Sequence, residues 1–139
     1  VIANNILCHA QLIEARTGKR PIIYSRASWV DPYMAGATWL NNYDWWLAHY
    51  LSTPDEHPGP PKLPKTVTKW LIHQTTSHGA PIGVESKQMD YDRWNGDEAA
   101  VYRYANLPVP IPQPTWEEAI DAWARTLGYN GPPPPKPSE

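Results

Sequence analysis

The chain has 139 residues, a formal net charge of −2 at pH 7 and a pI near 6.2. This charge lacks the basic excess of a nucleic-acid-binding protein, and no apolar run approaches the roughly 20 residues of a membrane span. A single cysteine, Cys8, excludes an internal disulfide framework, and no signal peptide is visible in this chain.

Tryptophan, tyrosine and proline are the residue types that stand out. The chain has 8 Trp and 8 Tyr but no Phe. Rings with a polar atom on an apolar body suit surfaces that stack sugars or bases, although they also fill cores. Fourteen of the 17 prolines fall between residues 54 and 64, 108 and 114, or 132 and 137. Proline therefore indicates the boundaries between segments.

The first predicted elements are a helix and a strand. Residues 1–17 have apolar side chains at helical spacing, and Gly18 is a typical C-terminal stop. Because the chain enters this periodic segment directly, with no Met before Val1, we expect a processed product or a fragment. The sequence PIIYS, residues 21–25, then reads as a short buried strand of a parallel sheet.

Three more strands and a short closing helix are predicted after a helical or irregular stretch at 28–42. They cover residues 44–51, 66–77, 84–91 and 97–104. Strands separated by crossovers predict an α/β fold with a parallel sheet. Such a sheet needs helices on both faces, and this chain has too few to cover it alone. We therefore expect half of a larger structure.

A different organisation begins after Leu107. The sequence LPVPIPQP is an extended, proline-rich spacer. Thr115 followed by Glu118 predicts a capping box at the start of an amphipathic helix. The predicted domains are a body at 1–105, a linker at 106–114, a helix at 115–129 and a proline-rich tail at 130–139.

An acidic cluster follows the fourth predicted strand, where Asp90, Asp92, Asp97 and Glu98 lie within nine residues around Trp94. A calcium-binding EF-hand is excluded because its fifth position would be Trp94 and its glycine falls one place late. Asp90 and Asp92 would share one face of a strand, as an Asp-x-Asp metal pair requires. However, no glycine-rich phosphate loop or basic cluster accompanies them.

Other catalytic arrangements find little support. Ser77 and His78 are adjacent but have no G-x-S-x-G elbow, and the five histidines lack zinc-binding spacing. An acid at the C-terminal end of a barrel strand, near Trp and Tyr, is the arrangement that sugar hydrolysis uses. The alternative is that Asp90 only caps the end of a strand.

Four motifs in this order resemble the C-terminal half of glycoside hydrolase family 25, the Chalaropsis-type lysozymes, which are N-acetylmuramidases. They are PIIYS at 21–25, WLAHY at 46–50, HQTT at 73–76 and MDYDRW at 89–94. The resemblance covers roughly residues 1–104. It implies an α/β fold, the C-terminal half of a TIM-like β/α barrel, followed by the proline-rich spacer and the C-terminal helix.

The chain departs from the family pattern at several positions. His73 and Thr75 stand where the family has Trp and Tyr, Asp92 stands where it has Asn, and His49 where it often has Gln. The family's acidic pair, an Asp-x-Glu just before the first helix, has no counterpart in these 139 residues. Asp90 matches the family's last-strand acid.

The resemblance also implies roles for individual residues. Asp90 would be catalytic, either adding negative field to the developing positive charge or orienting the substrate's N-acetyl group. The general acid would be the family's upstream Glu. The residues implied to bind substrate are Tyr24, Trp46, His49, Tyr50, Gln74, Asp92 and Trp94. The resemblance implies no metal and no cofactor.

Two functions remain open at this point. The first is a peptidoglycan-degrading muramidase, of which this chain alone is inactive because the general acid is missing. The second is a non-catalytic carbohydrate-binding or structural half-barrel that docks a partner. The expected partners are peptidoglycan glycan strands and either the missing N-terminal half of the barrel or a second copy. The expected location is extracellular or at the cell wall, in a protein of bacterial or phage origin.

Overall fold

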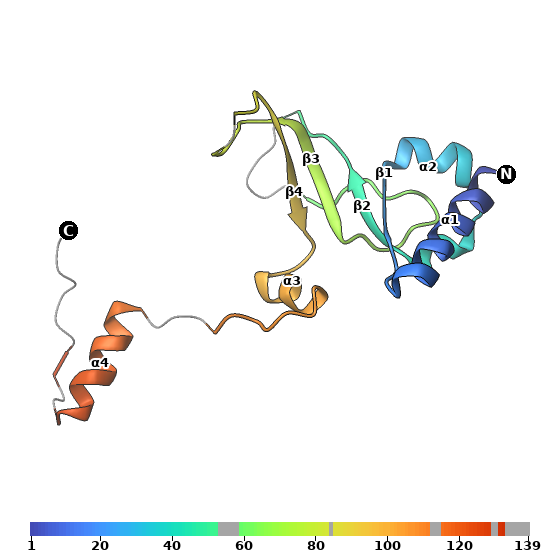
Figure 1. Ribbon diagram of the computed structural model, residues 1–139. Helices are drawn as coiled ribbons and strands as arrows, with labels where there is room; N and C mark the ends of the chain where they lie inside the picture. The colour runs from blue at the N-terminus through green and yellow to red at the C-terminus, as the bar shows by residue number, and fades with distance from the viewer. Residues whose placement is uncertain (53–58, 84, 112–114, 129–130, 133–139) are drawn as a thin grey trace. The chain divides into compact units, whose positions relative to one another are not determined.

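The computed structural model of the chain describes residues 1–52, 59–83, 85–111, 115–128 and 131–132 (Figure 1). The chain divides into two compact units, Val1–Asp97 and Glu98–Glu139. Of the described elements, the four strands, the first two α-helices and the 3₁₀ helix lie in the first unit. The predicted domain boundaries at 105 and 114 stay predictions, and residues 112–114 and 133–139 lie outside the described part.

The first helix and the first strand confirm the sequence prediction. Helix α1 spans Ile2–Thr17 and ends at Gly18, whose φ of 68° lets its backbone N–H donate to the Glu14 carbonyl. Strand β1 follows at Ile22–Ser25. The left-handed conformation is one that glycine adopts without a Cβ penalty, so the position of Gly18 fixes where the helix stops.

The stretch predicted as helical or irregular, residues 28–42, forms parts of two helices, and the second predicted strand follows it. Helix α2 spans Ala27–Met34, the 3₁₀ helix η1 spans Thr38–Asn42, and strand β2 spans Asp44–Ala48. Strand β2 ends before the predicted residue 51. Its hydrogen bonding continues nonetheless, because the N–H of His49 donates to Gln74 and the N–H of Leu51 donates to Thr75.

Strands β3, Ile72–Gly79, and β4, Met89–Trp94, both begin later than predicted. Residues 66–71 are not strand, and the side chain of Asn41 binds the backbone of Thr66 and Thr68 within them. Its Nδ2 donates to the Thr66 carbonyl at 2.7 Å, and its Oδ1 accepts from the Thr68 N–H at 2.9 Å. These bonds satisfy backbone groups that would otherwise pair with a neighbouring strand.

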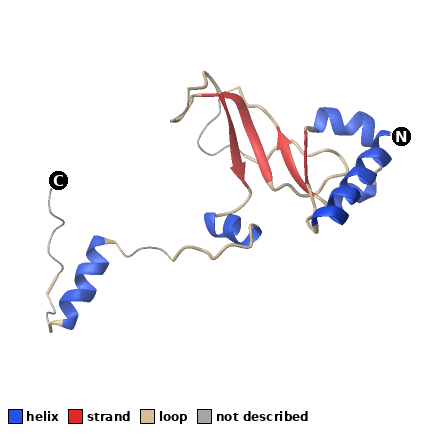
Figure 2. Cartoon of the chain, viewed as in Figure 1, coloured by secondary structure: helices blue, strands red, loops and turns tan. Residues whose placement is uncertain are grey.

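The four strands form one sheet in the order β1-β2-β3-β4 (Figure 2). The pairs β1/β2 and β2/β3 are parallel, as predicted, but β3/β4 is antiparallel. The expectation of an entirely parallel sheet is therefore wrong at β4. The described residues of the 80–88 connection form no helix, and parallel neighbours need a crossover of a dozen or more residues.

The two faces of the sheet differ in what covers them. Trp45 and Leu47 of β2 are fully buried on one face, and the indole N–H of Trp45 donates to the Leu40 carbonyl at 2.9 Å. The core around them is completed by Val30, Met34, Leu40 and Val67. Alternation along each strand sends Tyr24, Trp46 and Gln74 to the opposite, open face.

Two helices lie in the described residues of the second unit. Helix α3 spans Glu98–Tyr104, which confirms the predicted closing helix, and α4 spans Trp116–Thr126. The predicted capping box is present, since the Thr115 hydroxyl accepts from the Glu118 N–H at 3.2 Å and the Glu118 carboxylate accepts from the Thr115 N–H at 2.8 Å. Among the described residues, no helix has the length and apolarity to cross a membrane.

The described part of the chain is thus a mixed α/β fold with a four-stranded sheet and flanking helices. Its place as the C-terminal half of a TIM-like barrel stays a prediction.

Candidate active site

The strand directions bring the predicted site residues other than Trp94 toward one end of the sheet, the edge at which the parallel strands finish. The parallel strands β1, β2 and β3 end at this edge. Because β4 runs antiparallel to β3, its first residues reach the same edge, and Asp90 is its second residue. Asp90 was expected at the end of a last parallel strand. It lies instead near the start of an antiparallel one, and the reversed direction keeps it at the site edge.

Gln74 is the centre of a hydrogen-bonded group on the open face. The Tyr24 hydroxyl donates to Gln74 Oε1 at 2.7 Å, and the Tyr50 hydroxyl donates to the same oxygen at 3.0 Å. Gln74 is only 2% exposed, whereas Tyr24 and Tyr50 are about half exposed at 52% and 48%. A buried amide therefore fixes two phenols whose rings reach the surface.

The pKa of Tyr24 is raised above its ordinary value by burial, by the neighbouring Tyr50 and by the negative charges of Asp90 and Asp92. The Tyr24 phenol donates its proton to Gln74 Oε1. A raised pKa agrees with this geometry, because it keeps that proton on Tyr24. With their hydrogens directed at Gln74 Oε1, the two phenol oxygens present lone pairs to the open face. This end of the site therefore offers acceptors to a ligand's hydroxyl or amide N–H groups.

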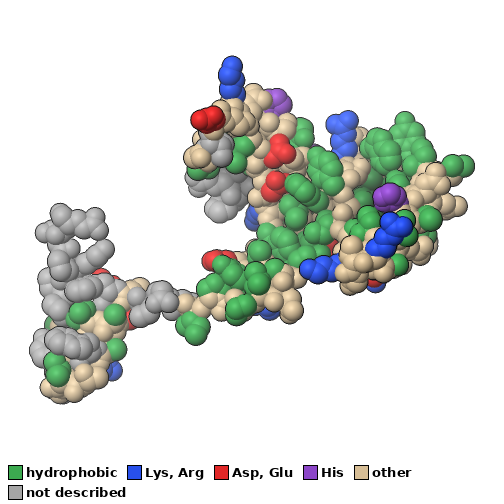
Figure 3. Space-filling model, viewed as in Figure 1, with side chains coloured by type: hydrophobic (Ala, Val, Ile, Leu, Met, Phe, Trp, Pro, Cys, Tyr) green, Lys and Arg blue, Asp and Glu red, His purple; other side chains and the backbone are tan. Residues whose placement is uncertain are grey.

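Trp46 and Asp92 form the second part of the open face. The indole N–H of Trp46 donates to Asp92 Oδ1 at 2.6 Å, and the Trp46 ring meets Tyr24 edge-on at 5.0 Å between centroids. Desolvation raises the pKa of Asp92, Asp90 raises it further, and the Trp46 hydrogen bond acts in the opposite sense. Figure 3 shows acidic side chains over β4 beside hydrophobic ones.

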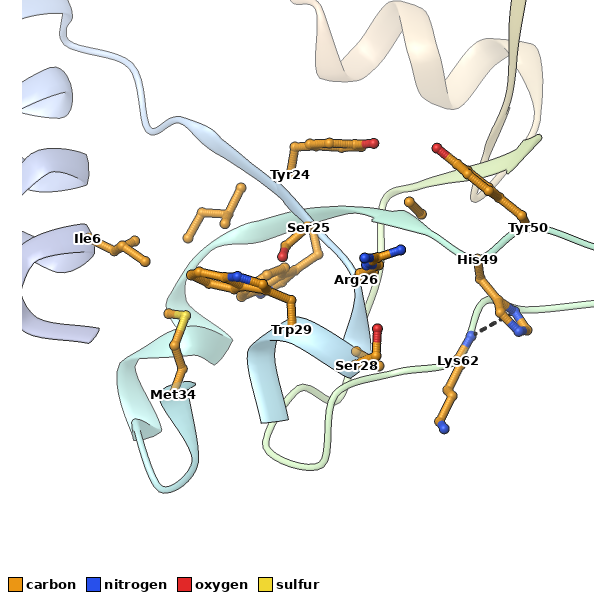
Figure 4. Close-up of a pocket in the computed structure, with 14 residues that line it drawn as sticks. Ile6, Tyr24, Ser25, Arg26, Ser28, Trp29, Met34, His49, Tyr50 and Lys62 are labelled. Atoms are coloured by element: carbon orange, nitrogen blue, oxygen red, sulfur yellow. Dashed lines mark hydrogen bonds between the residues drawn. The ribbon is translucent and has the colours of Figure 1, made fainter. Parts of the chain in front are cut away.

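His49 is not brought to the Gln74 group. Figure 4 shows His49 and Tyr50 pointing in opposite directions from consecutive positions. His49 Nδ1 accepts from the Lys62 N–H at 3.2 Å, and its ring stacks on His73 at 5.9 Å. Burial, then His73 and Lys62, lower the pKa of His49. Its predicted substrate contact stays a prediction.

Trp94, in contrast, lies away from this edge. It is the last residue of β4 and pairs with Ile72, the first residue of β3, which places it at the opposite end of the strand from Asp90. Its predicted substrate contact likewise stays a prediction. Among the described residues, no three His, Cys, Asp or Glu side chains gather into a group that could hold a metal ion.

Sequence reasoning missed a cavity of about 840 Å³ beside the Gln74 group. Tyr24 and Tyr50 border it, and Arg26 and Lys62 contribute two cations to its lining. No motif signals these cations, because each is a single basic residue just after a strand or within a loop. The position of Arg26 directly after β1 was the one clue that the sequence offered.

Comparison with known proteins identifies one matching family and several similar proteins. The family described as Glycosyl hydrolases family 25 matches residues 1–84. The protein YegX of Escherichia coli O6:H1 is 33% identical over 86 residues, which cover 62% of this chain and 28% of that protein. YegX of Escherichia coli O157:H7 is 28% identical over 96 residues, or 69% of this chain and 31% of that protein. The chain thus spans about three tenths of these relatives.

Two solved structures share the fold. A muramidase from Acremonium alcalophilum matches 76% of this chain and 45% of its own with a TM-score of 0.60 and 20% identity. A bacterial lysozyme from Streptomyces coelicolor matches 73% of this chain and 44% of its own with a TM-score of 0.58 and 25% identity.

Proposed function

Because this chain belongs to glycosyl hydrolases family 25, we propose that it is part of a muramidase-type glycoside hydrolase that degrades peptidoglycan. The observation that carries the proposal is the open face on which Gln74 fixes Tyr24 and Tyr50 while Asp92 fixes Trp46. Rigid aromatic rings beside oriented acceptors suit a glycan, whose sugars offer apolar ring faces and hydroxyl donors. The likeness to a muramidase and a lysozyme of known structure supports this function.

Asp90 is the acid proposed to act on the reacting sugar. Glycosidic cleavage develops positive charge on the sugar ring, and a nearby carboxylate stabilises that charge. The charge of Asp90 reaches both Tyr24 and Asp92, since it raises the pKa of each. Asp90 also shares a strand face with Asp92, which accepts the Trp46 hydrogen bond on the open face. This position supports the proposal that Asp90 acts on a bound glycan. Proton donation to the leaving oxygen needs a separate general acid.

These 139 residues contain no Asp-x-Glu sequence, which is the pair that the family resemblance assigns to proton donation. We therefore propose that this polypeptide by itself binds glycan without cleaving it. The partners proposed are peptidoglycan glycan strands and the polypeptide that supplies the acidic pair, and the proposed location is the cell wall. The exposed Tyr24 and Tyr50 also suit the second candidate, a non-catalytic glycan-binding module.

The test compares two polypeptides on purified peptidoglycan, with release of reducing sugar as the measurement. One is the 139-residue chain, and the other is the gene product extended upstream of Val1. We expect hydrolysis only from the extended form, and we expect Asp90→Asn in that form to lower the rate about 10²–10⁴-fold. Asp97→Asn serves as the control, because Asp97 lies beyond the strand end.

Three outcomes would contradict parts of this proposal. Hydrolysis by the 139-residue chain would show that it carries its own general acid. An unchanged rate in Asp90→Asn would remove Asp90 from the mechanism. An upstream sequence without an acidic pair, together with glycan binding, would favour the binding module over the enzyme.

A further inference from the structure

The cavity beside the Gln74 group has two chemically different ends (Figure 4). Apolar side chains from α1, α2, β1 and β2 line one end, among them Ile6, Trp29 and Met34. Figure 4 shows Arg26 and Lys62 on the other side, away from Ile6 and Met34. A ligand that fills this cavity must therefore combine an apolar portion with a group that favours cations.

Two cations, Arg26 and Lys62, line the polar end of the cavity. Arg26 directly follows β1, and Lys62 lies in the connection between β2 and β3. The described residues that line the cavity include no Asp or Glu. His49 also lines the cavity, and burial, His73 and Lys62 lower its pKa, which favours the neutral ring. Its Nδ1 accepts from the Lys62 N–H, which leaves the ring proton on Nε2.

The cavity is continuous with the proposed glycan face. Tyr24 and Tyr50 line the cavity, and the same two phenols donate to Gln74. Arg26 and His49 directly follow the carboxyl ends of parallel strands, where ligands of open α/β sheets bind. A substituent of a glycan that rests on the open face can thus enter the cavity past these two rings.

Resting on the proposed function, we propose that this cavity binds the acidic peptide attached to the muramic acid of a peptidoglycan strand, with Arg26 and Lys62 holding a free carboxylate of that peptide. Guanidinium and ammonium groups form strong charge-assisted hydrogen bonds with carboxylates. The apolar end accommodates the methyl and methylene groups of the same peptide. The cavity then makes the protein prefer peptide-bearing glycan to bare glycan.

The test measures binding of three probes to the 139-residue chain by calorimetry. The probes are an N-acetylglucosaminyl-N-acetylmuramyl tetrapeptide, the same compound with its peptide carboxylates amidated, and an N-acetylglucosamine tetramer. We expect the free carboxylate to bind about tenfold more tightly than the amidated form, in line with one charge-assisted hydrogen bond. We expect Arg26→Gln and Lys62→Gln to remove most of that preference.

Lys65→Gln is the matched control, because Lys65 lies in the same connection but outside the cavity lining. It should keep the full preference, and thermal unfolding should show that all three variants fold. Equal binding of the free and amidated peptides, or an unchanged preference in both cavity variants, would overturn the inference. So would competition by inorganic phosphate at concentrations where acetate has no effect, since the site would then select phosphate.

The design separates this inference from the proposed function. Binding of all three probes with equal affinity would overturn the peptide site and leave the glycan face in place. Failure of every probe to bind would overturn both.

Discussion

At the scale of single residues, Gln74 determines what the open face offers to a ligand. One amide oxygen accepts from two phenols, so both tyrosines are oriented by a residue that is itself 2% exposed. Buried polar groups that are fully paired hold a unique geometry, and removing one partner releases the others. Gln74 is thus a positioning residue for Tyr24 and Tyr50.

We expect Gln74→Met to lower affinity for an N-acetylglucosamine tetramer about tenfold, because both phenols lose their common acceptor. Gln74→Glu retains two acceptor oxygens at the same place and should keep more of the affinity. Titration followed by tryptophan fluorescence measures both variants. A Met variant that binds like the parent chain would show that the tyrosines need no such support.

His49 and His73 form a second residue-scale feature, on the opposite side of β2 and β3 from Gln74. Their rings stack at 5.9 Å, and His73 Nε2 lies 2.9 Å from the His49 carbonyl. His73 is fully buried, and its Nδ1 has no hydrogen-bond partner among the described residues. An unpaired buried polar atom costs about 1–3 kcal/mol. Burial, His73 and Lys62 together lower the pKa of His49.

The lowered pKa of His49 predicts a pH dependence of stability. Below the unfolded value of about 6.5, the unfolded chain binds more protons at this position than the folded chain, so the free energy of unfolding falls as pH decreases. We expect His49→Gln to reduce this slope in urea unfolding measured between about pH 5 and pH 7. His9→Gln is the control on α1. An equal slope in His49→Gln and the parent chain would contradict the assignment.

At the scale of elements, the β3/β4 pair positions the acids. Gly79 in β3 lies against the ring of Tyr91 in β4, and a Cβ at Gly79 would come within 2.5 Å of that ring. The Tyr91 hydroxyl also donates to the Ala80 carbonyl at 2.6 Å. Tyr91 lies between Asp90 and Asp92 in the strand. Its contact with Gly79 therefore fixes the backbone that carries both carboxylates.

We expect Gly79→Ala to destabilise the fold by about 1–3 kcal/mol, as overpacking of a closed site does. It should also weaken glycan binding, because the displaced Tyr91 ring moves its two acidic neighbours. Gly59→Ala is the matched control, since nothing lies within 4 Å of a Cβ there, and its stability should stay within about 0.5 kcal/mol. Urea unfolding of both variants provides the measurement. Equal stabilities of the two variants would show that the Gly79 contact is not required.

The sequence predicted the helices whose ends are specified by residues close to them in the chain. The apolar spacing of 1–17 with Gly18, and the Thr115–Glu118 pair, specify helix ends through neighbouring residues. The start of β3 was missed because Asn41, 25 residues from Thr66, holds that backbone. The direction of β4 depends on how the 80–88 connection turns, which hydrophobic pattern alone does not encode.

The candidate site was predictable to a similar extent. The family motifs predicted that Tyr24, Trp46, Tyr50 and Gln74 bind substrate, and the structure places these four near one another. Their contact with substrate stays a prediction. His49 points away from Tyr50 and Trp94 lies at the opposite end of β4, because strand alternation and strand length decide which side and which end a residue occupies. Arg26 and Lys62 were missed because the cavity joins separate segments.

At the scale of the whole molecule, the first unit leaves apolar surface and strand edge uncovered. Strand β1 is at the edge of the sheet, so one side of its backbone has no neighbouring strand within the described part. Tyr24 and the half-buried Trp46 lie on the open face beside it. Free strand edges and exposed apolar faces favour pairing with another chain.

We therefore expect the 139-residue chain to associate in solution, either with a second copy or with a polypeptide that supplies the rest of the proposed barrel. A charge on the strand edge disfavours such pairing, so Ile22→Lys in β1 should shift the mass measured by sedimentation toward the monomer. Ile82→Lys, at a position that is already 73% exposed between β3 and β4, should leave it unchanged. A monomeric mass for the parent chain in dilute solution, with a cooperative thermal transition, would show that the open edge of β1 is stable without a partner.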